Sequence, residues 1–172
     1  MSVPWTRVER LRTDHHIDSF DCGRRDITSW LLDSALEQDR RGAVTTWVCL
    51  KDDKVIGYYA LTMTTITVPS DMSNTRRRKW NVGADDHAPA HLIAKLGLDT
   101  RFQRAGHGAE LLHLALSTCL AASDLVSCNL VCVDAADDRL IGFYEKAGFH
   151  RLADRRLIVT SNALRKRFGH QS

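Results

Sequence analysis

The sequence predicts an α/β (α+β) fold, in which helices pack on both faces of a mixed, mostly antiparallel central sheet. Residues 45–68 carry two β-branched and aromatic runs around a turn, a pattern typical of a β-hairpin. Residues 125–135 form a near-continuous apolar run, typical of a strand covered on both faces. Amphipathic segments alternate with such strands, which favours helices packed on a sheet. Because the 172 residues contain no linker or low-complexity run, we expect a single domain over residues 1–172.

The first predicted helix covers residues 26–41. Ile27, Trp30 and Leu31 fall at the i, i+3, i+4 spacing of one helix face, and Gly42 follows as a stop signal. The pattern therefore indicates an amphipathic helix whose apolar face packs against the sheet.

A turn precedes this helix and a hairpin follows it. Residues 20–23 (FDCG) predict a turn whose Phe packs inward. The hairpin has strands at 45–50 and 55–68, joined by a turn at 51–54. Residues 69–90 hold Ser, Asn, Asp, Gly and two of the three prolines, and we expect a long surface excursion there. Loops of this length are uncommon unless they have a function.

The second half of the chain alternates strands and helices. Residues 90–99 predict a strand, a glycine-containing turn follows, and residues 109–123 predict a helix with leucines on its buried side. A buried strand at 125–135 leads to a short helix at 137–148, which has an acidic first turn and a glycine at its end. One or two final strands are expected over residues 149–161.

Composition excludes several classes of protein. Apolar residues make up 44% and charged residues 26% of the chain, as in ordinary folded domains. No apolar run approaches the roughly 20 residues that cross a bilayer, and the first residues lack a secretory signal, so we expect a cytoplasmic protein without membrane contact. The five cysteines include no C-x-x-C pair, and we expect them to be buried apolar residues.

Positive charge is clustered, although the net charge is only +3. Residues 75–80 (TRRRKW) place four cations side by side, and Arg24 and Arg25 form a smaller pair. A cluster of this kind is either a solvated face or, where several share a surface, a site for a polyanion. The histidines have no carboxylate or cysteine at ligand spacing, so no metal site is expected.

The turn after the strand at 90–99 has the composition of an anion site. A strand, a tight turn and a helix start bring unpaired backbone N–H groups and the positive end of a helix dipole to one point. Gly106 and Gly108 remove Cβ atoms that would block a pyrophosphate, and Gln103 and Arg104 add donors. Neither a P-loop nor a dinucleotide fingerprint fits, because the Lys-Ser/Thr pair and the third glycine are missing. A glycine turn without a ligand stays open as the alternative.

Two motifs together resemble the GNAT superfamily of acetyl-CoA-dependent N-acetyltransferases. Gln103, Gly106 and Gly108 match its [QR]-x-x-G-x-[GA] pattern, and residues 143–149 (FYEKAGF) match its YEKxGF pattern after the next predicted strand. The resemblance implies the GNAT fold and an acetyltransferase that uses acetyl-CoA and no metal. The cofactor-binding residues that it implies are Leu96, Gly97, Leu98, Gln103, Arg104, Ala105, Gly106, His107, Gly108, Ala109, Asp137, Phe143 and Tyr144. Asp137 stands where many relatives carry Asn.

The N-terminal half resembles the GNAT toxins of bacterial type II toxin–antitoxin systems, of the TacT/AtaT kind. Their shared pattern of F-x-C-G, a helix containing W-L, a Thr-rich strand and G-Y-Y-A-L occurs here at 20–23, 30–31, 45–46 and 57–61. The resemblance implies a toxin that acetylates the α-amine of the amino acid on charged tRNA and blocks translation. It also implies a cytoplasmic bacterial homodimer restrained by a ribbon-helix-helix antitoxin, with DNA met only through that antitoxin.

The chemistry of an aminoacyl acceptor agrees with this implication. A free α-amine has a pKa near 7.7–8.0, against about 10.4 for lysine, so near neutral pH roughly a fifth of it is already neutral and little general-base power is required. The reaction does require an oxyanion donor and an acid for the departing CoA thiolate. The backbone N–H of Leu98 and the phenol of Tyr144 are the candidates. Outside its motif, Tyr144 would be interpreted as an aromatic on the inner face of an amphipathic helix.

An acceptor surface is also predicted. Candidate contacts to the tRNA phosphates are the cations Arg24, Arg25, Arg76, Arg77, Arg78 and Lys79. Tyr58 and Tyr59 are adjacent on a strand and must face opposite ways, so either is a candidate for the acceptor groove. Two other functions stay open. One is an N-acetyltransferase for a small amine or a protein N-terminus, and the other is a non-catalytic CoA-binding or repressor module.

Overall fold

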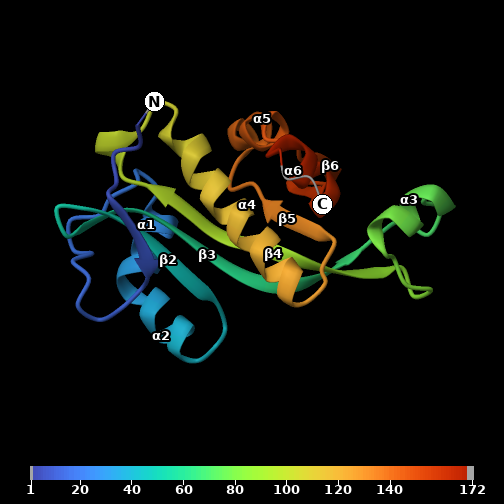
Figure 1. The fold of residues 1–172 in the computed structure, drawn as a ribbon, viewed down its shortest axis with the longest axis horizontal. Helices are drawn as coiled ribbons and strands as arrows, with labels where there is room; N and C mark the ends of the chain where they lie inside the picture. Colours follow the sequence, from blue (N-terminus) through green and yellow to red (C-terminus); the bar gives the residue numbers. More distant parts are fainter. Residues whose placement is uncertain (1, 170–172) are drawn as a thin grey trace. The chain divides into compact units, whose positions relative to one another are not determined.

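The computed structural model describes residues 2–169. Its strands are hydrogen-bonded in the order β1-β2-β3-β4-β5-β7-β6 within one sheet (Figure 1). The strands are β1 (Arg7–Arg10), β2 (Thr45–Lys51), β3 (Lys54–Thr67), β4 (His87–Leu98), β5 (Leu130–Asp134), β6 (His150–Ala153) and β7 (Arg156–Thr160). The helices are α1 (Arg25–Asp33), α2 (Ala35–Arg40), α3 (Asn74–Trp80), α4 (His107–Leu125), α5 (Asp138–Lys146) and α6 (Ser161–Arg167), with the 3₁₀ helix η1 (Thr100–Phe102) before α4. The predicted fold class, a mixed and mostly antiparallel sheet with helices, is confirmed.

The chain forms two compact units. The N-terminal unit comprises residues 2–62 and 93–115, and the C-terminal unit comprises residues 63–92 and 116–169. Strands β3 and β4 and helix α4 contribute residues to both units. A single domain over residues 1–172 stays a prediction.

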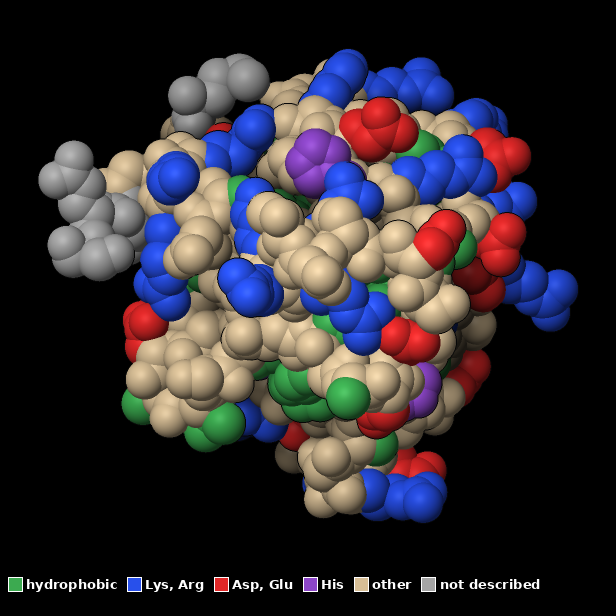
Figure 2. All heavy atoms as spheres, turned by 90° about the vertical axis from the view of Figure 1, so that its right-hand side faces the viewer, with side chains coloured by type: hydrophobic (Ala, Val, Ile, Leu, Met, Phe, Trp, Pro, Cys, Tyr) green, Lys and Arg blue, Asp and Glu red, His purple; other side chains and the backbone are tan. Residues whose placement is uncertain are grey.

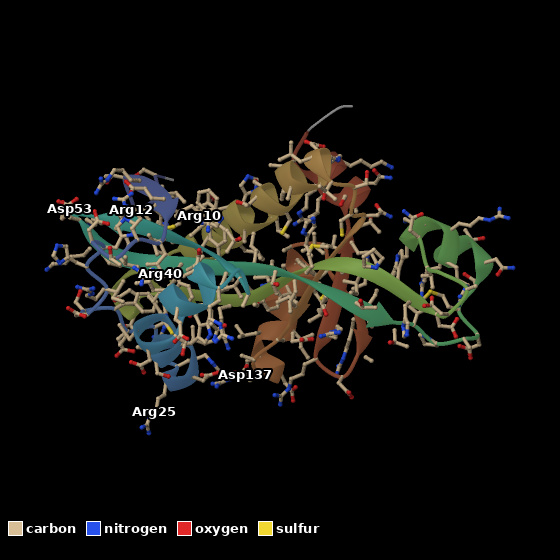
Figure 3. All side chains as sticks on the ribbon, turned by 90° about the horizontal axis from the view of Figure 1, so that it is seen from below. Arg10, Arg12, Arg25, Arg40, Asp53 and Asp137 are labelled. Atoms are coloured by element: carbon tan, nitrogen blue, oxygen red, sulfur yellow. The ribbon has the colours of Figure 1, made fainter. Side chains whose placement is uncertain are left out.

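Antiparallel strands build the N-terminal unit. β1 pairs with β2, and β2 pairs with β3. The β2–β3 hairpin turns at Asp52 and Asp53, whose φ angles of 49° and 61° are the left-handed values that a two-residue hairpin favours. In Figure 3, α1 and α2 lie on one face of these strands and the start of α4 lies on the other. The predicted hairpin is confirmed, with strand ends that differ by one residue.

Apolar side chains of α1, β2 and β3 form the core of this unit. Phe20, Leu31 and Tyr58 are among its buried members, so the inward packing of Phe20 is confirmed. Full burial of a leucine side chain such as Leu31 stabilises the fold by roughly 1.5–3 kcal/mol. The Tyr58 hydroxyl donates a hydrogen bond to the Ile27 carbonyl at 2.7 Å. Tyr58 and Tyr59 are both buried. A place for either of them at the acceptor groove stays a prediction.

The helix predicted over residues 26–41 is interrupted. Ser34 has φ −130° and ψ −29°, outside the helical range, and it separates α1 from α2. Its N–H still donates to the Trp30 carbonyl at 3.0 Å, and its own carbonyl accepts from the Gln38 N–H at 3.0 Å. The hydrogen-bonded path is therefore nearly continuous, and the apolar periodicity gives no sign of the break.

The C-terminal unit is built around β7, which pairs antiparallel with both β5 and β6. Its core includes Ile66, Ala90, Leu130, Cys132 and Ile158, from four different strands. Helix α3 connects the end of β3 to the start of β4 (Figure 1). The two predicted strands near the C-terminus are confirmed as β6 and β7.

Some element predictions for the second half are wrong. Residues 69–90 are not only a surface excursion, because they contain α3 and the first residues of β4. The strand predicted at 125–135 is the shorter β5, because α4 continues through Leu125, whose side chain is exposed. The predicted helices at 109–123 and 137–148 are confirmed as α4 and α5.

Two short elements were not predicted. Strand β1 (RVER) is an edge strand next to β2, and its four residues show no alternation of apolar and polar side chains. Helix α6 is seven residues long and rich in cations, so it offers little apolar periodicity.

The cysteines are free and buried, which confirms their expected role in the core. Burial raises the pKa of Cys49 and Cys119 to about 12, and that of Cys132 to about 11. Within residues 2–169, no helix is long and apolar enough to cross a membrane.

Candidate functional site

The glycine turn joins the end of β4 to the start of α4. β4 ends at Leu98, η1 follows, and α4 begins at His107. Arg104 and Gly106 have φ angles of 65° and 84°. A left-handed conformation costs a residue that carries a Cβ about 1 kcal/mol or more, and such strain clusters at functional sites. The conformation of Arg104 therefore marks this turn as a candidate binding site.

The geometry of this turn fits a phosphate group. Residues 103–106 are exposed, so an anion can reach the backbone. Helix α4 is 19 residues long, and its first N–H groups have no acceptor four residues back within the helix. They point out of the helix end that carries the positive end of the dipole. Since Gly106 has no Cβ, a phosphate can lie against the turn without a clash.

Gly97, predicted to contact the cofactor, also has a packing role. A Cβ at this position would lie 2.9 Å from Ile27 Cγ2 and from Tyr58 Cε1, and 3.3 Å from Phe20 Cζ. These side chains belong to the core of the N-terminal unit and have little room to move. The absence of a side chain at Gly97 therefore lets the core close over this end of β4.

The side chain of Gln103 is held by two backbone carbonyls. Its Nε2 donates to the Leu98 carbonyl at 2.7 Å and to the Cys22 carbonyl at 2.9 Å. Both amide hydrogens are thereby used. Gln103 thus joins the end of β4 to the segment 20–23, a contact that the local motif does not reveal.

Asp99 is a buried carboxylate that sequence reasoning missed. Its side chain, 1% exposed, accepts from the backbone N–H groups of Asp21 and Arg101 and from the Arg101 guanidinium, at 2.8–3.2 Å. Burial by itself raises the pKa of this carboxyl, but these hydrogen bonds hold the pKa below its ordinary value. The signal in the sequence is an Asp directly after an apolar strand, a position suited to capping η1.

Tyr144, the candidate acid, is a buried residue of α5 in the C-terminal unit. Its ring makes edge-to-face contacts with Phe143 and Phe149, with centroids 5.1 and 5.8 Å away. Burial raises the pKa of its phenol to about 12, so the hydroxyl keeps its proton at neutral pH. This is the protonation state that a general acid needs.

Asp137 and Gly148 delimit α5. Asp137 is the N-cap, and its carboxylate accepts from the Arg139 N–H at 2.9 Å. Gly148 has a φ angle of 101°, which only glycine adopts readily at a helix end. The predicted helix signals are thus confirmed, and Asp137 has a structural role at this helix end (Figure 3).

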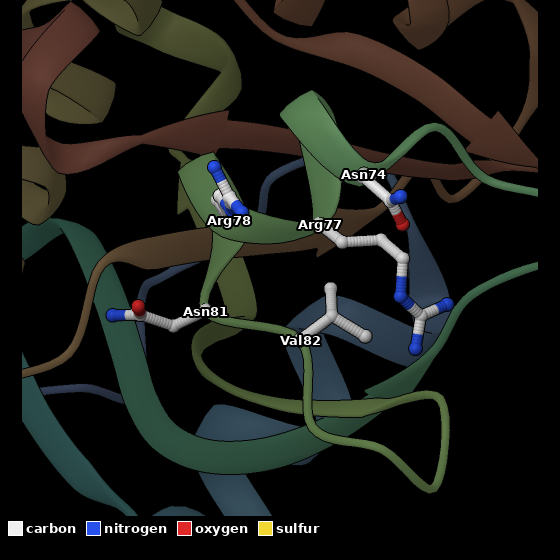
Figure 4. Close-up of a pocket in the computed structure, with 5 residues that line it drawn as sticks. All are labelled: Asn74, Arg77, Arg78, Asn81 and Val82. Carbon is white, nitrogen blue, oxygen red and sulfur yellow. The ribbon is translucent and has the colours of Figure 1, made fainter.

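The four cations of α3 differ in their surroundings. Arg77 is held within the unit, since its guanidinium pairs with Asp86 at 2.7 Å and donates to the Gly83 carbonyl at 2.9 Å. Arg76 lies over the Trp80 ring, 5.9 Å from its centroid. Figure 4 shows the side chains of Arg77 and Arg78 pointing apart around an open surface pocket.

A groove of the C-terminal unit runs beside α3. Its lining consists of apolar, hydroxyl-bearing and basic side chains, among them Met72, Arg76, Lys79, Trp80 and Arg151, and includes no acidic residue of those that the structure describes. Figure 2 shows the face toward which α3 projects, with Lys and Arg side chains spread across its centre. Within the described residues, this unit therefore presents a basic surface at α3 that suits a polyanion.

The remaining predicted site residues lie in the N-terminal unit. Arg24 pairs with Asp26 at 3.5 Å, and Arg25 projects outward from α1 (Figure 3). The ring of His107 contacts Trp5 edge-on, with centroids 6.4 Å apart. Residues 2–169 contain no group of three His, Cys, Asp or Glu side chains suited to a metal ion.

The mixed sheet and the turn that opens α4 are those of an acyltransferase fold. The family model described as "Acetyltransferase (GNAT) family" matches residues 5–149. The chain therefore belongs to the GNAT acetyltransferases.

Three matches, to two proteins, illustrate the range of similarity. Over 140 residues the chain is 27% identical to a tRNA-acetylating toxin of Mycobacterium tuberculosis, and the match covers 81% of either chain. A solved structure of AtaT complexed with acetyl-methionyl-tRNAfMet has a TM-score of 0.84 at 22% identity, covering 94% of this chain and 98% of that one. A mutant AtaT toxin bound to the C-terminus of the antitoxin AtaR and acetyl-CoA has a TM-score of 0.79 at 21% identity, covering 94% and 97%. The two solved structures share the fold of this chain.

Proposed function

We propose that this protein is the toxin of a toxin–antitoxin pair, which transfers acetyl from acetyl-CoA to the α-amine of the amino acid on charged tRNA and so blocks translation. The observation that carries the proposal is the exposed, left-handed glycine turn at the start of α4. Membership of the GNAT family supports the acetyl donor. The likeness to a tRNA-acetylating toxin, over most of both chains, supports the acceptor.

The backbone of the turn is the proposed pyrophosphate site. The N–H groups of residues 104–108 hold the phosphate oxygens, and the exposed Arg104 adds a charged donor. The N–H of Ala109 donates to the Gly106 carbonyl at 3.2 Å, so Ala109 lines the site without donating to a phosphate. The end of β4, Leu96 to Leu98, provides backbone groups for the pantetheine arm. Phe143 and Asp137 are retained as proposed cofactor contacts from the family resemblance. Acetyl-CoA supplies an activated thioester when bound.

Two groups of the chain carry the proposed chemistry. The α-amine attacks as the neutral species, which is well populated near pH 8, and a C–N bond forms. The backbone N–H of Leu98 donates to the negative charge that develops on the acetyl oxygen. When the C–S bond breaks, the Tyr144 hydroxyl gives its proton to the sulfur. The attacking nitrogen releases one proton to solvent, and the Tyr144 phenolate takes one up from solvent, so the enzyme is restored. The buried phenol suits this role because its pKa keeps it protonated.

Proposed partners follow from the same assignment. The phosphates of tRNA meet Arg24 and Arg25 on the N-terminal unit, and Arg76, Arg78 and Lys79 of α3 on the C-terminal unit. Arg77 is instead held by Asp86 and Gly83. A ribbon-helix-helix antitoxin restrains the enzyme and alone mediates contact with DNA. We further propose that the protein acts as a cytoplasmic homodimer. The AtaT mutant toxin seen with the C-terminus of its antitoxin supports such a partner.

The direct test is an acetylation assay with total charged tRNA. The purified protein is incubated with acetyl-CoA and charged tRNA, while CoA release is followed and the aminoacyl ends are analysed by mass spectrometry. We expect N-acetylated aminoacyl ends with the wild type and far fewer with Tyr144→Phe. Deacylated tRNA, free amino acids and a polyamine are the matched acceptors. Release of CoA with the polyamine alone would assign a small-amine acetyltransferase, and none with any amine would leave a binding module.

A further inference from the structure

The side-chain amide of Gln103 donates both of its hydrogen bonds within the protein. The two acceptors of its Nε2 are the carbonyls of Leu98 and Cys22, at 2.7 and 2.9 Å. Backbone carbonyls only accept, so the amide nitrogen has to face them and the orientation of the carboxamide is determined. A phosphate oxygen also only accepts. The side chain therefore has no remaining hydrogen to give to a pyrophosphate while these two bonds exist.

Further bonds join the same two segments. The Asp21 N–H donates to Asp99 Oδ2 at 3.2 Å, and the Thr100 N–H donates to the Asp21 carbonyl at 2.9 Å. Gly23, at φ 81°, approaches so closely that a Cβ there would lie 3.2 Å from Thr100 Cγ2. The segment 20–23 is thus bonded to the chain between β4 and the glycine turn, and Gln103 is the side chain that bridges them.

The bridge acts on the residue that carries the proposed oxyanion donor. The peptide between Leu98 and Asp99 is held on both sides. Its carbonyl accepts from Gln103, and its N–H donates to the Ile56 carbonyl at 2.8 Å. With this peptide plane held, the end of β4 has little freedom to rotate, and the direction of the Leu98 N–H is limited with it. A donor that is fixed before reaction stabilises an oxyanion more than one that must reorient.

We propose that Gln103 is a positioning residue for acetyl transfer, which holds Leu98 and the segment 20–23 in place, while the backbone of the turn and Arg104 bind the pyrophosphate. This assignment rests on the proposed function for its rate measurement only. A positioning role and a phosphate-ligand role for Gln103 affect different measured quantities. A ligand contributes to acetyl-CoA affinity, whereas a positioning residue contributes to the rate at saturating substrate.

The test compares two substitutions of Gln103 with one of its neighbour. Gln103→Met keeps the size of the side chain and removes its donors, whereas Gln103→Arg keeps N–H donors. Arg104→Met, in the same exposed turn, is the matched control. We measure the Kd of acetyl-CoA by calorimetry, the single-turnover rate at saturating acetyl-CoA and charged tRNA, and hydrogen exchange in peptides covering residues 20–24 and 98–103. All measurements are made well below the lowest Tm of the set.

For Gln103→Met we expect an acetyl-CoA Kd within twofold of wild type, a rate lower by about tenfold or more, and faster exchange in both peptides. Gln103→Arg should recover most of the rate. For Arg104→Met, a change in the proposed phosphate site, we expect a Kd raised several-fold and wild-type exchange in both peptides. A raised Kd with an unchanged rate and exchange in Gln103→Met would overturn the proposal. If wild type fails to acetylate charged tRNA, calorimetry and exchange still decide the role of Gln103, so the two failures are distinguishable.

Discussion

At the scale of single residues, the burial of Tyr144 keeps its hydroxyl protonated and so suits it to donate a proton. Tyr144→Phe is expected to lower the single-turnover rate by roughly 10²-fold, because it removes the proton donor, while the acetyl-CoA Kd stays unchanged. The pKa of about 12 keeps the phenol protonated. The rate should therefore rise with pH through the α-amine pKa near 8 and show no descending limb up to pH 9. A rate profile over pH 6–9 with saturating substrates checks this.

Tyr58→Phe is the matched control for that substitution. It removes the same atom from another buried tyrosine, whose hydroxyl donates to the Ile27 carbonyl. We expect a loss of about 1 kcal/mol in unfolding free energy and no change in the chemical rate. An equal loss of rate in both variants would show that the effect of Tyr144→Phe is structural.

Asp99 is expected to link stability to pH. Its pKa is lowered in the folded protein, so its contribution is fully present above the unfolded value near 3.9 and is lost as pH falls through the folded value. Asp99→Asn places an amide among the N–H donors of Asp21 and Arg101, and should cost roughly 1–3 kcal/mol at pH 7. Urea unfolding at pH 7 and at pH 3 measures both variants. The difference between them should shrink at pH 3; a constant difference would contradict the linkage.

At the scale of elements, α3 is expected to carry part of the salt dependence of tRNA binding. A triple variant, Arg76→Ala, Arg78→Ala and Lys79→Ala, removes up to three phosphate contacts. Each lost contact should reduce the slope of log K against log salt concentration by about 0.7–0.9. Filter binding or fluorescence titration measures this slope. The salt concentration is varied over about 50–300 mM, where the release of counterions dominates the salt dependence.

Arg77→Ala is the control on the same helix. Because Arg77 pairs with Asp86 and Gly83, its loss should lower the Tm of the protein and leave the salt slope of tRNA binding unchanged. If the triple variant binds with an unchanged slope, α3 is not the RNA surface.

Elements with a strong period were predictable and those without it were not. The hairpin and α4 follow from alternation and from leucines on one face. The break at Ser34 leaves the apolar spacing intact, and β1 is a charged edge strand, so neither has a signal in the local pattern. Periodicity reports which face is buried, and it is insensitive to a single altered dihedral.

The candidate site was predictable only in its local part. The spacing of Gln103, Gly106 and Gly108 located the turn, because a cradle for phosphate needs those residue types close together in sequence. The contact of Gln103 with Cys22 spans 81 positions, and that of Asp99 with Asp21 spans 78. Such contacts form only in the folded sheet, so the local sequence pattern around the glycine turn does not predict them.

At the scale of the whole molecule, the two compact units each have a core, and both bury their cysteines. We expect the native protein to react slowly with a thiol reagent at pH 7.5, because burial limits access and the raised pKa of Cys49, Cys119 and Cys132 suppresses the thiolate. Titration with a chromogenic disulfide should release five thiols after denaturation and almost none before. A fast-reacting thiol in the native state would contradict this.

Because its native cysteines are buried, the protein is suited to labelling at a single introduced cysteine. A cysteine introduced at an exposed position of α3, such as Thr75, would be the only thiol to react quickly with a maleimide dye. A dye at this position would report directly on whether RNA approaches α3. The core and the proposed cation contacts would keep their wild-type residues.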